Sequence, residues 1–309
     1  MFYLRGVMVA LGFFGVVYCL LSMAVVCGWR CACLLWRKPT IGRAHLLFAV
    51  RILPLAGSAF LTLAFALPAF LLLERAIDED LGTYLFSACT LLLLAAAWLR
   101  VATAQSGASR VVAHWLEGAR ALHTDATGPA LQCRKGPPLL LYGVSTPVVL
   151  ASETAVALLS PDELRVAVQH EIGHMRSRDN LKKLMVYATA FPGMASLEQA
   201  WQDAAEFAAD EAAVASSDDA VELASALIKL ADLAPSQELP AFTTGLATCS
   251  ALVRRRVQRL LDWDEPGSHA VRQRWWFFVP VMLTIGPYVA IHYAQALLFT
   301  HRFTEWFIH

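Results

Sequence analysis

Four long apolar stretches divide the chain, and each is long enough to cross a lipid bilayer as a helix. A helical span needs about 20 apolar residues. The stretches occupy residues 6–28, 52–73, 81–99 and 275–299, and none of them contains Lys, Arg, Asp or Glu. Proline in the second and fourth stretches is compatible with a span, because neighbouring helices can satisfy the backbone groups that proline frees. The pattern predicts four transmembrane helices, three of them within residues 1–100.

The connections between these stretches differ in charge. The first connection contains five basic residues and no acidic one, and the third ends in an arginine-rich segment before residue 275. The second connection, residues 74–80, is mainly acidic. Because Lys and Arg are enriched in cytoplasmic loops, the first and third connections are expected in the cytoplasm. Both termini, including the short tail at 300–309, are then expected outside.

The third connection, residues 101–274, is long enough for one globular domain. Its sequence predicts a helix at Ser109–Leu122, strands at Leu139–Tyr142 and Pro147–Ala151, and mainly helices after Ser160. We therefore expect a cytoplasmic α+β domain inserted between the third and fourth spans. Pro147–Ala151 could form an edge strand, to which an extended peptide could add by β-augmentation.

Composition agrees with a membrane protein. Hydrophobic residues make up 57% of the chain, mean hydropathy is +0.51, and 16% of residues are charged; soluble domains average about 25% charged residues. Lys and Arg total 25 and Asp and Glu total 25, so the formal net charge is zero. These values exclude a disordered tail, a basic nucleic-acid-binding domain and an ordinary cytosolic enzyme. No direct binding of nucleic acid is expected.

The candidate chemistry lies in one predicted helix of the inserted domain. Ser160 is a suitable N-cap, and Glu163 three residues later completes a capping box. The helix continues through His170, Glu171 and His174, in the pattern H-E-x-x-H. Residues four apart share a helix face, so both imidazoles can reach one metal ion. Glu171 projects about 100° away, where it can act on a metal-activated water, as in zinc peptidases.

A catalytic zinc site needs a third protein ligand. The metzincin pattern is excluded, because Ser177 and Asn180 stand where it requires Gly and His. A carboxylate on a later helix is the alternative, and Glu206 is the preferred candidate. Asp210, one turn further on the same face, can accept the free N–H of a ligating imidazole. The remaining candidates for the third ligand are Glu211 and then Glu198.

The sequence from His170 to Leu181 resembles the active-site helix of the membrane metallopeptidases typified by the β-lactam sensor-transducers. Tyr142–Pro147, the Glu206-x-x-x-Asp210 pair and the position between spans three and four agree with this resemblance. The soluble core is also similar to prenyl-protein-processing and heat-shock membrane proteases. The resemblance implies a zincin-type, gluzincin-like domain that holds one Zn²⁺ on His170, His174 and Glu206, with Glu171 as general base.

The resemblance also bears on Arg256 and on regulation. In the prenyl-protease branch an arginine at the spacing of Arg256 lies in the active site, where it would stabilise the oxyanion; a basic helix beside anionic lipid is the alternative. Drug-sensing members carry an extracellular penicillin-binding domain after span four, but here only about ten residues follow. Any signal is then expected to come from the short outer loop, the spans, the lipid bilayer or a partner chain, which would be a sensor protein or a second copy of the chain.

The functional hypothesis is a zinc metalloendopeptidase of a bacterial inner membrane. Its substrate would be a cytoplasmic or membrane-proximal protein, such as a transcriptional repressor, cleaved in limited, regulatory proteolysis. A quality-control or prenyl-peptide protease, an intramembrane protease and a non-catalytic signalling adaptor with a vestigial zinc site are the competing hypotheses. The intact Glu171 argues against the adaptor, because a structural zinc site does not need a base.

Overall fold

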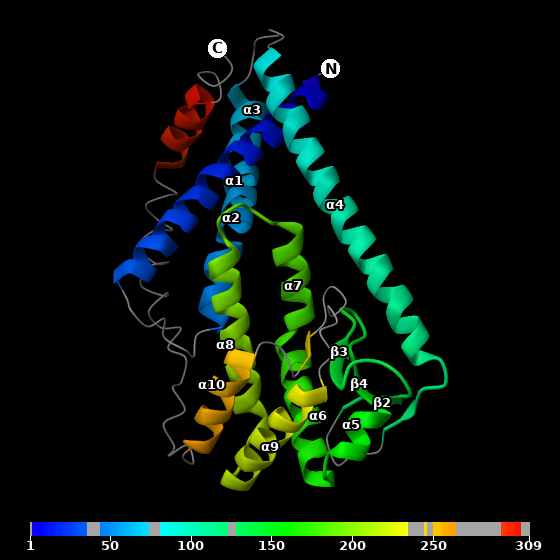
Figure 1. Cartoon of the computed structure of the whole chain (residues 1–309). Coiled ribbons are helices and arrows are strands. Elements are labelled where there is room, and N and C mark those ends of the chain that lie inside the picture. The colour runs from blue at the N-terminus through cyan, green and yellow to red at the C-terminus, as the bar shows by residue number, and fades with distance from the viewer. Residues whose placement is uncertain are drawn as a thin grey trace. The chain divides into compact units, whose positions relative to one another are not determined.

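The computed structural model describes residues 2–35, 44–73, 81–122, 128–233, 244–245, 250–263 and 292–303 (Figure 1). The chain divides into two units. The first unit comprises residues 1–35, 50–97 and 266–309, and the second comprises residues 36–49 and 98–265. The second unit contains the whole H-E-x-x-H region and most of the insert predicted at 101–274. Each unit is described by itself.

Three helical stretches are long and apolar enough to cross a membrane: Tyr3–Leu35, Ala44–Leu73 and Tyr84–Leu116. They belong to α1 (Phe2–Leu35), to α2 (Ala44–Leu61) with the π-helical segment Thr62–Ala66 and α3 (Leu67–Leu73), and to α4 (Leu81–Leu116). Three of the four predicted spans are thus helices with the length and apolar composition of a membrane span, which is consistent with a helical membrane protein. Of the fourth predicted span, 275–299, only the part from residue 292 is described, and it is helical; the rest lies outside the described residues.

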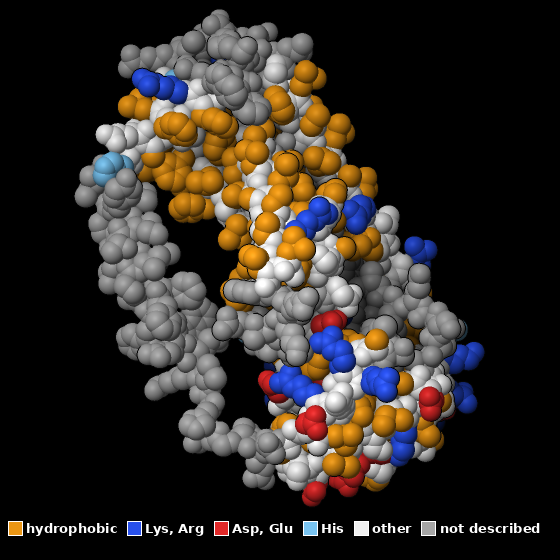
Figure 2. All heavy atoms as spheres, turned by 60° about the vertical axis from the view of Figure 1, so that its left-hand side comes forward, with side chains coloured by type: hydrophobic (Ala, Val, Ile, Leu, Met, Phe, Trp, Pro, Cys, Tyr) orange, Lys and Arg blue, Asp and Glu red, His pale blue; other side chains and the backbone are white. Residues whose placement is uncertain are grey.

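The helices of the first unit expose large apolar side chains, as a lipid-facing surface requires. Figure 2 shows hydrophobic side chains gathered over these helices. Five of the exposed residues are Leu20, Phe60, Leu63, Leu72 and Leu92. In water so large an apolar surface would be unstable, but in a bilayer it faces a solvent of similar polarity.

The second span tolerates Pro68 because another segment replaces the lost hydrogen bond. Proline has no N–H, so in an α-helix it cannot bond to the carbonyl four residues earlier. That carbonyl belongs to Ala64, in the π-helical segment, and it accepts a hydrogen bond of 2.8 Å from the Tyr293 hydroxyl. Residues 292–303 therefore pair with the second span at the position where Pro68 weakens it.

Helix α4 corrects the prediction of a separate helix at Ser109–Leu122. The third span was expected to end at residue 99, but α4 runs without a break from Leu81 to Leu116. Residues 100–116 contain no proline, and their Ala, Arg, Gln and Leu residues favour a helix. The chain leaves the helix at Gly118, whose φ of +75° is readily adopted by glycine.

The second unit contains a small mixed sheet of five strands. The strands are β1 (Arg120–Ala121), β2 (Ala130–Cys133), β3 (Leu139–Tyr142), β4 (Val148–Ser152) and β5 (Thr244–Gly245), in the order β1-β2-β4-β3-β5. The two predicted strands are present, but the expectation that Pro147–Ala151 forms an edge is wrong. β4 pairs in parallel with β2 on one side and antiparallel with β3 on the other. Its backbone hydrogen bonds are therefore used within the sheet, which is why it is almost completely buried.

In the described part of the second unit, six helices follow α4 in the sequence and accompany the sheet. They are α5 (Glu153–Leu158), α6 (Pro161–Ser177), α7 (Asp179–Ala188), α8 (Ala195–Ala213), α9 (Ser217–Leu233) and α10 (Ser250–Leu261). Helix α6 packs against the sheet at β3 and β4, and against α8 and α9 (Figure 1). Its apolar residues, such as Val166, Ala167 and Val168, are fully buried in the core that it shares with the sheet and α9.

Small residues bring α6 and α8 close together. A Cβ atom at Gly173 would lie 3.4 Å from the Cα of Ala209 and 3.5 Å from the Cβ of Ala212. These are ordinary van der Waals distances, so small side chains on both helices let α6 and α8 pack in close contact here. The close approach allows the carboxylates of α8 to reach the histidines of α6.

The predicted capping box is present and anchors α6 to α9. The backbone N–H of Ser160 donates to Glu163 at 2.7 Å, and the N–H of Glu163 donates to the Ser160 hydroxyl at 3.1 Å. Glu163 also accepts hydrogen bonds from Lys229 at 2.6 Å and from Ser225 at 2.5 Å. Burial alone would raise the pKa of Glu163, but these partners outweigh it and lower the pKa below its usual 4.5.

We expect Glu163→Gln to lower the free energy of unfolding by about 1–2 kcal/mol at neutral pH, because buried hydrogen bonds to a charged group are lost. A carboxylate with a lowered pKa stabilises the fold above its unfolded pKa, and this stability is lost as pH falls through the folded value. The difference between variant and wild type should therefore shrink below about pH 4. This difference in the free energy of unfolding is measured by denaturing the full chain in detergent at several pH values. Glu153→Gln, at an exposed site in α5, is the control and should change little at any pH.

Candidate metal centre

Three potential metal ligands converge between α6 and α8. Nε2 of His170 and Nε2 of His174 are 3.2 Å apart. Oε2 of Glu206 lies 3.6 Å from the first of these nitrogens, and Oε1 of Glu206 lies 3.5 Å from the second. All three side chains are buried, and one ligand atom from each lies within 4.8 Å of the others. The structure thus brings together the ligand set that the sequence predicted.

These groups lie close enough together for their side chains to surround one zinc ion. Zinc–ligand bonds of about 2.0–2.2 Å at tetrahedral angles place donor atoms about 3.3–3.6 Å apart. The two nitrogens are 3.2 Å apart, and each lies 3.5 or 3.6 Å from a different oxygen of Glu206. Two unprotonated imidazole nitrogens at such a distance would repel each other, so a proton or a metal ion is needed between these groups. Two imidazoles and one carboxylate, with a fourth position left open, form the donor set of catalytic zinc sites.

Each histidine is oriented by a carboxylate at its other ring nitrogen. Nδ1 of His170 lies 3.0 Å from Asp210, as the sequence predicted, and Nδ1 of His174 lies 2.8 Å from Asp179. Such partners fix the tautomer, so that Nε2 is the nitrogen left for a metal. Asp179 was not predicted. It reaches back to His174 because Arg178 adopts a left-handed conformation, with φ 55° and ψ 40°, and turns the chain between α6 and α7.

Arg256 on α10 links the two carboxylates of α8. Its Nε and Nη2 donate to the two oxygens of Asp210 at 2.8 and 2.6 Å, and its Nη1 donates to Glu206 at 2.9 Å. The side chain is completely buried, so Arg256 is not available to lipid headgroups. Arg254 and Arg255 are the exposed arginines of this helix. Arg256 therefore belongs to the centre as a group that holds a candidate ligand and its neighbour in place.

Glu171 is the exception in this well-bonded cluster. It is fully buried, yet neither carboxylate oxygen has a hydrogen-bond partner among the described residues. A buried carboxylate without partners is costly to keep. Burial raises the pKa of Glu171, which the positive charges of His170 and His174 only partly oppose. This arrangement suits a group that accepts a proton from a water held at the centre.

The surrounding charges favour a cation at the centre. Burial alone would lower the pKa of His174, but Glu206 and Asp179 outweigh it and raise the pKa to about 10. Burial would raise the pKa of Glu206, and the charges of His174 and Arg256 instead hold it well below its usual value. Lys183 is half-buried, and burial lowers the pKa of its ammonium. The nearby carboxylates of Glu206, Asp179 and Glu171 act to raise this pKa but do not outweigh burial. The excess of carboxylates is therefore balanced by protons or by a metal.

The other candidates for the third ligand lie elsewhere on α8. Glu211 is exposed and forms an ion pair with Arg259. Glu198 lies in the first turn of α8, two turns before Glu206, and is outside the cluster of possible metal ligands. Among the described residues Glu206 is thus the carboxylate that completes the centre.

The comparisons with known proteins add no constraint. No model of a known protein family matches the chain, and no curated protein matches it. The functional argument therefore rests on the geometry of the centre and on the three apolar helices.

Proposed function

We propose that this protein is a membrane zinc metalloendopeptidase with a zincin-type catalytic domain. One combination of observations carries the proposal: three buried donors that converge within 4.8 Å, beside a buried carboxylate with no hydrogen-bond partner among the described residues. A purely structural zinc site would have four protein ligands and no need of such a carboxylate. A vestigial site would be expected to lose Glu171, the most costly group to bury here.

The residues of the centre have separate roles in this proposal. His170, His174 and Glu206 would hold the ion, with Asp210 and Asp179 orienting the imidazoles. Zinc in such a site supplies Lewis acidity, which polarises a peptide carbonyl and makes water more acidic. Glu171 takes the proton of the attacking water and delivers it to the leaving amine. Arg256 acts as a positioning residue, because its N–H groups already bind Asp210 and Glu206.

The proposed substrate is a cytoplasmic or membrane-proximal protein that is cleaved at a limited number of sites, such as a transcriptional repressor. The charge of the connecting segments supports an orientation with the second unit in the cytoplasm and both termini outside. A bacterial inner membrane with four spans is proposed from the four apolar stretches and the family resemblance. Helix α6 is not among the three helices that could cross a membrane in the described part of the chain. This favours a catalytic domain beside the bilayer over an intramembrane protease.

The first test is the zinc content of the full chain, purified in detergent without chelator. We expect about one zinc per chain in the wild type and little in Glu206→Ala, because a three-ligand site loses most of its affinity with one ligand. Glu211→Ala is the matched control: the same change, on the same helix, at an exposed carboxylate. Its zinc content should equal that of the wild type.

Two results would count against the proposal. Absence of zinc from the wild type would mean that no metal site exists. Stoichiometric zinc together with no cleavage of any peptide in a mixed library would favour the non-catalytic adaptor. If cleavage occurs, its profile separates the remaining alternatives: a single site in one protein indicates regulation, and many apolar sites indicate quality control or prenyl-peptide processing.

A further inference from the structure

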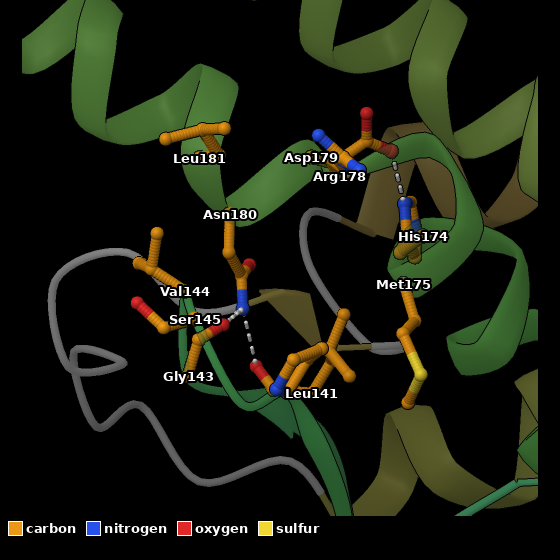
Figure 3. A pocket seen from close by; sticks show the side chains of 11 residues that line it. Leu141, Gly143, Val144, Ser145, His174, Met175, Arg178, Asp179, Asn180 and Leu181 are labelled. Carbon is orange, nitrogen blue, oxygen red and sulfur yellow. Dashed lines mark hydrogen bonds and ion pairs between the residues drawn. The ribbon is translucent and has the colours of Figure 1, made fainter.

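A cavity of about 400 Å³ opens beside the candidate metal centre (Figure 3). It lies between the end of β3 with the following loop and the turn from α6 to α7, and His174 forms part of its wall. A peptide bound with its scissile bond at the metal would therefore place a neighbouring residue in this cavity. The apolar part of the wall comes from Leu141, Val144, Pro147, Met175 and Leu181.

The loop side of the cavity is held in a fixed shape. The Asn180 amide donates to the carbonyls of Leu141 at 3.2 Å and Gly143 at 3.0 Å, as Figure 3 shows. Gly143 has a φ of +100°, and a Cβ atom there would lie 2.7 Å from the Thr146 carbonyl oxygen. Because Asn180 belongs to α7, these bonds join the loop directly to the turn that carries Asp179. The shape of the cavity is thus fixed by contacts within the domain.

The negative charge in the cavity wall is already balanced. Asp179 lies 2.8 Å from Nδ1 of His174 and 2.9 Å from the ammonium of Lys182. The Asn180 side chain is used by the two carbonyls. Asp179 and Asn180 therefore both have hydrogen-bond partners when no substrate is bound.

Arg178 differs from these neighbours. It lines the cavity and is exposed, and its guanidinium forms no hydrogen bond or ion pair with the residues that the structure describes. It also precedes the first turn of α7, whose amide N–H groups carry a partial positive charge, and no side chain caps that turn. A guanidinium and a helix N-terminus at one cavity both attract an anion, and a guanidinium pairs best with a carboxylate.

Building on the proposed peptidase function, we propose that this cavity is a subsite for a substrate residue that carries a carboxylate. Arg178 binds the carboxylate, and the apolar wall contacts the methylene groups. The carboxylate comes either from a Glu or Asp side chain close to the scissile bond or from the C-terminus of the peptide. The subsite would thus determine which peptides are positioned at the metal, without taking part in the proton transfers.

The test measures binding separately from hydrolysis. The full chain carrying Glu171→Gln is titrated against fluorescent short peptides, synthesised in pairs with Glu or Gln at each position and with a free or amidated C-terminus. We expect the preferred acidic peptide to bind about tenfold more tightly than its neutral partner, the effect of one charge-assisted hydrogen bond. Adding Arg178→Gln should abolish this preference, and Arg178→Lys should retain part of it. Arg176→Gln, at an exposed arginine outside the cavity, should leave it unchanged.

The results distinguish the two sources of the carboxylate. A preference that disappears on amidation identifies the C-terminus, and one that follows a single Glu position identifies a side chain. Equal binding of acidic and neutral peptides, a preference that survives Arg178→Gln, or no peptide binding at all would overturn the inference. Because Glu171→Gln protein is used, failure of the wild type to cleave peptides would overturn the proposed function while leaving the binding result intact.

Discussion

Replacing Glu171 with Gln is expected to reduce peptide cleavage by about 100- to 10,000-fold, the usual contribution of a general acid–base group. Gln has nearly the same shape as Glu but cannot take up the proton of the attacking water. Zinc content should not change, because Glu171 is not one of the converging ligands. Cleavage products of a peptide library, measured by mass spectrometry, and zinc per chain give the two readouts.

The same substitution should leave stability equal to or greater than that of the wild type. Glu171 is fully buried and accepts no hydrogen bond from the part of the chain that the structure describes, so removing its charge removes a desolvation penalty. A functional group kept at a cost in stability is typical of active sites. Glu198→Gln is the control, because Glu198 is a half-buried glutamate in the first turn of α8. It should change neither activity nor zinc content. Full activity in Glu171→Gln would exclude Glu171 as the base.

The centre could be predicted from sequence where its residues are related by helix periodicity. His170 and His174 share a face because they are four residues apart, and so do Glu206 and Asp210. To predict that these two faces meet, one further assumption was enough: that the small residues around them allow α6 and α8 to pack closely. In the structure, Gly173 of α6 faces Ala209 and Ala212 of α8 where the two helices meet.

Features that depend on backbone conformation or on tertiary pairing were not predictable. Asp179 orients His174 only because Arg178 adopts a left-handed conformation that its sequence does not require. The interior position of β4 depends on β2 and β3 pairing with it from opposite sides. The continuous α4 was missed because the change from apolar to polar residues near residue 100 suggested a boundary, whereas the backbone continues as a helix to Leu116.

Arg256→Ala is expected to lower the free energy of unfolding of the zinc-free protein by about 3–5 kcal/mol, the usual effect of removing one partner from a buried ion pair. The substitution leaves the carboxylates of Asp210 and Glu206 buried without the guanidinium that now bridges them. Arg256→Lys should recover only part of the loss, because an ammonium keeps the charge but cannot bind both oxygens of Asp210 in the same planar geometry.

Arg255→Ala provides the matched control for this loss. Arg255 is the preceding residue on α10, its side chain is 51% exposed, and it lies 3.5 Å from Asp203. Exposed ion pairs of this kind contribute about 0–1 kcal/mol. Adding Asp210→Asn to Arg256→Ala should restore part of the stability, because it removes one of the two buried charges left without a partner. A loss below about 1 kcal/mol in Arg256→Ala, with no recovery in the double variant, would mean that Arg256 does not hold Glu206 and Asp210 in place. The positioning of the candidate zinc ligand would then depend on α6 and α8 alone.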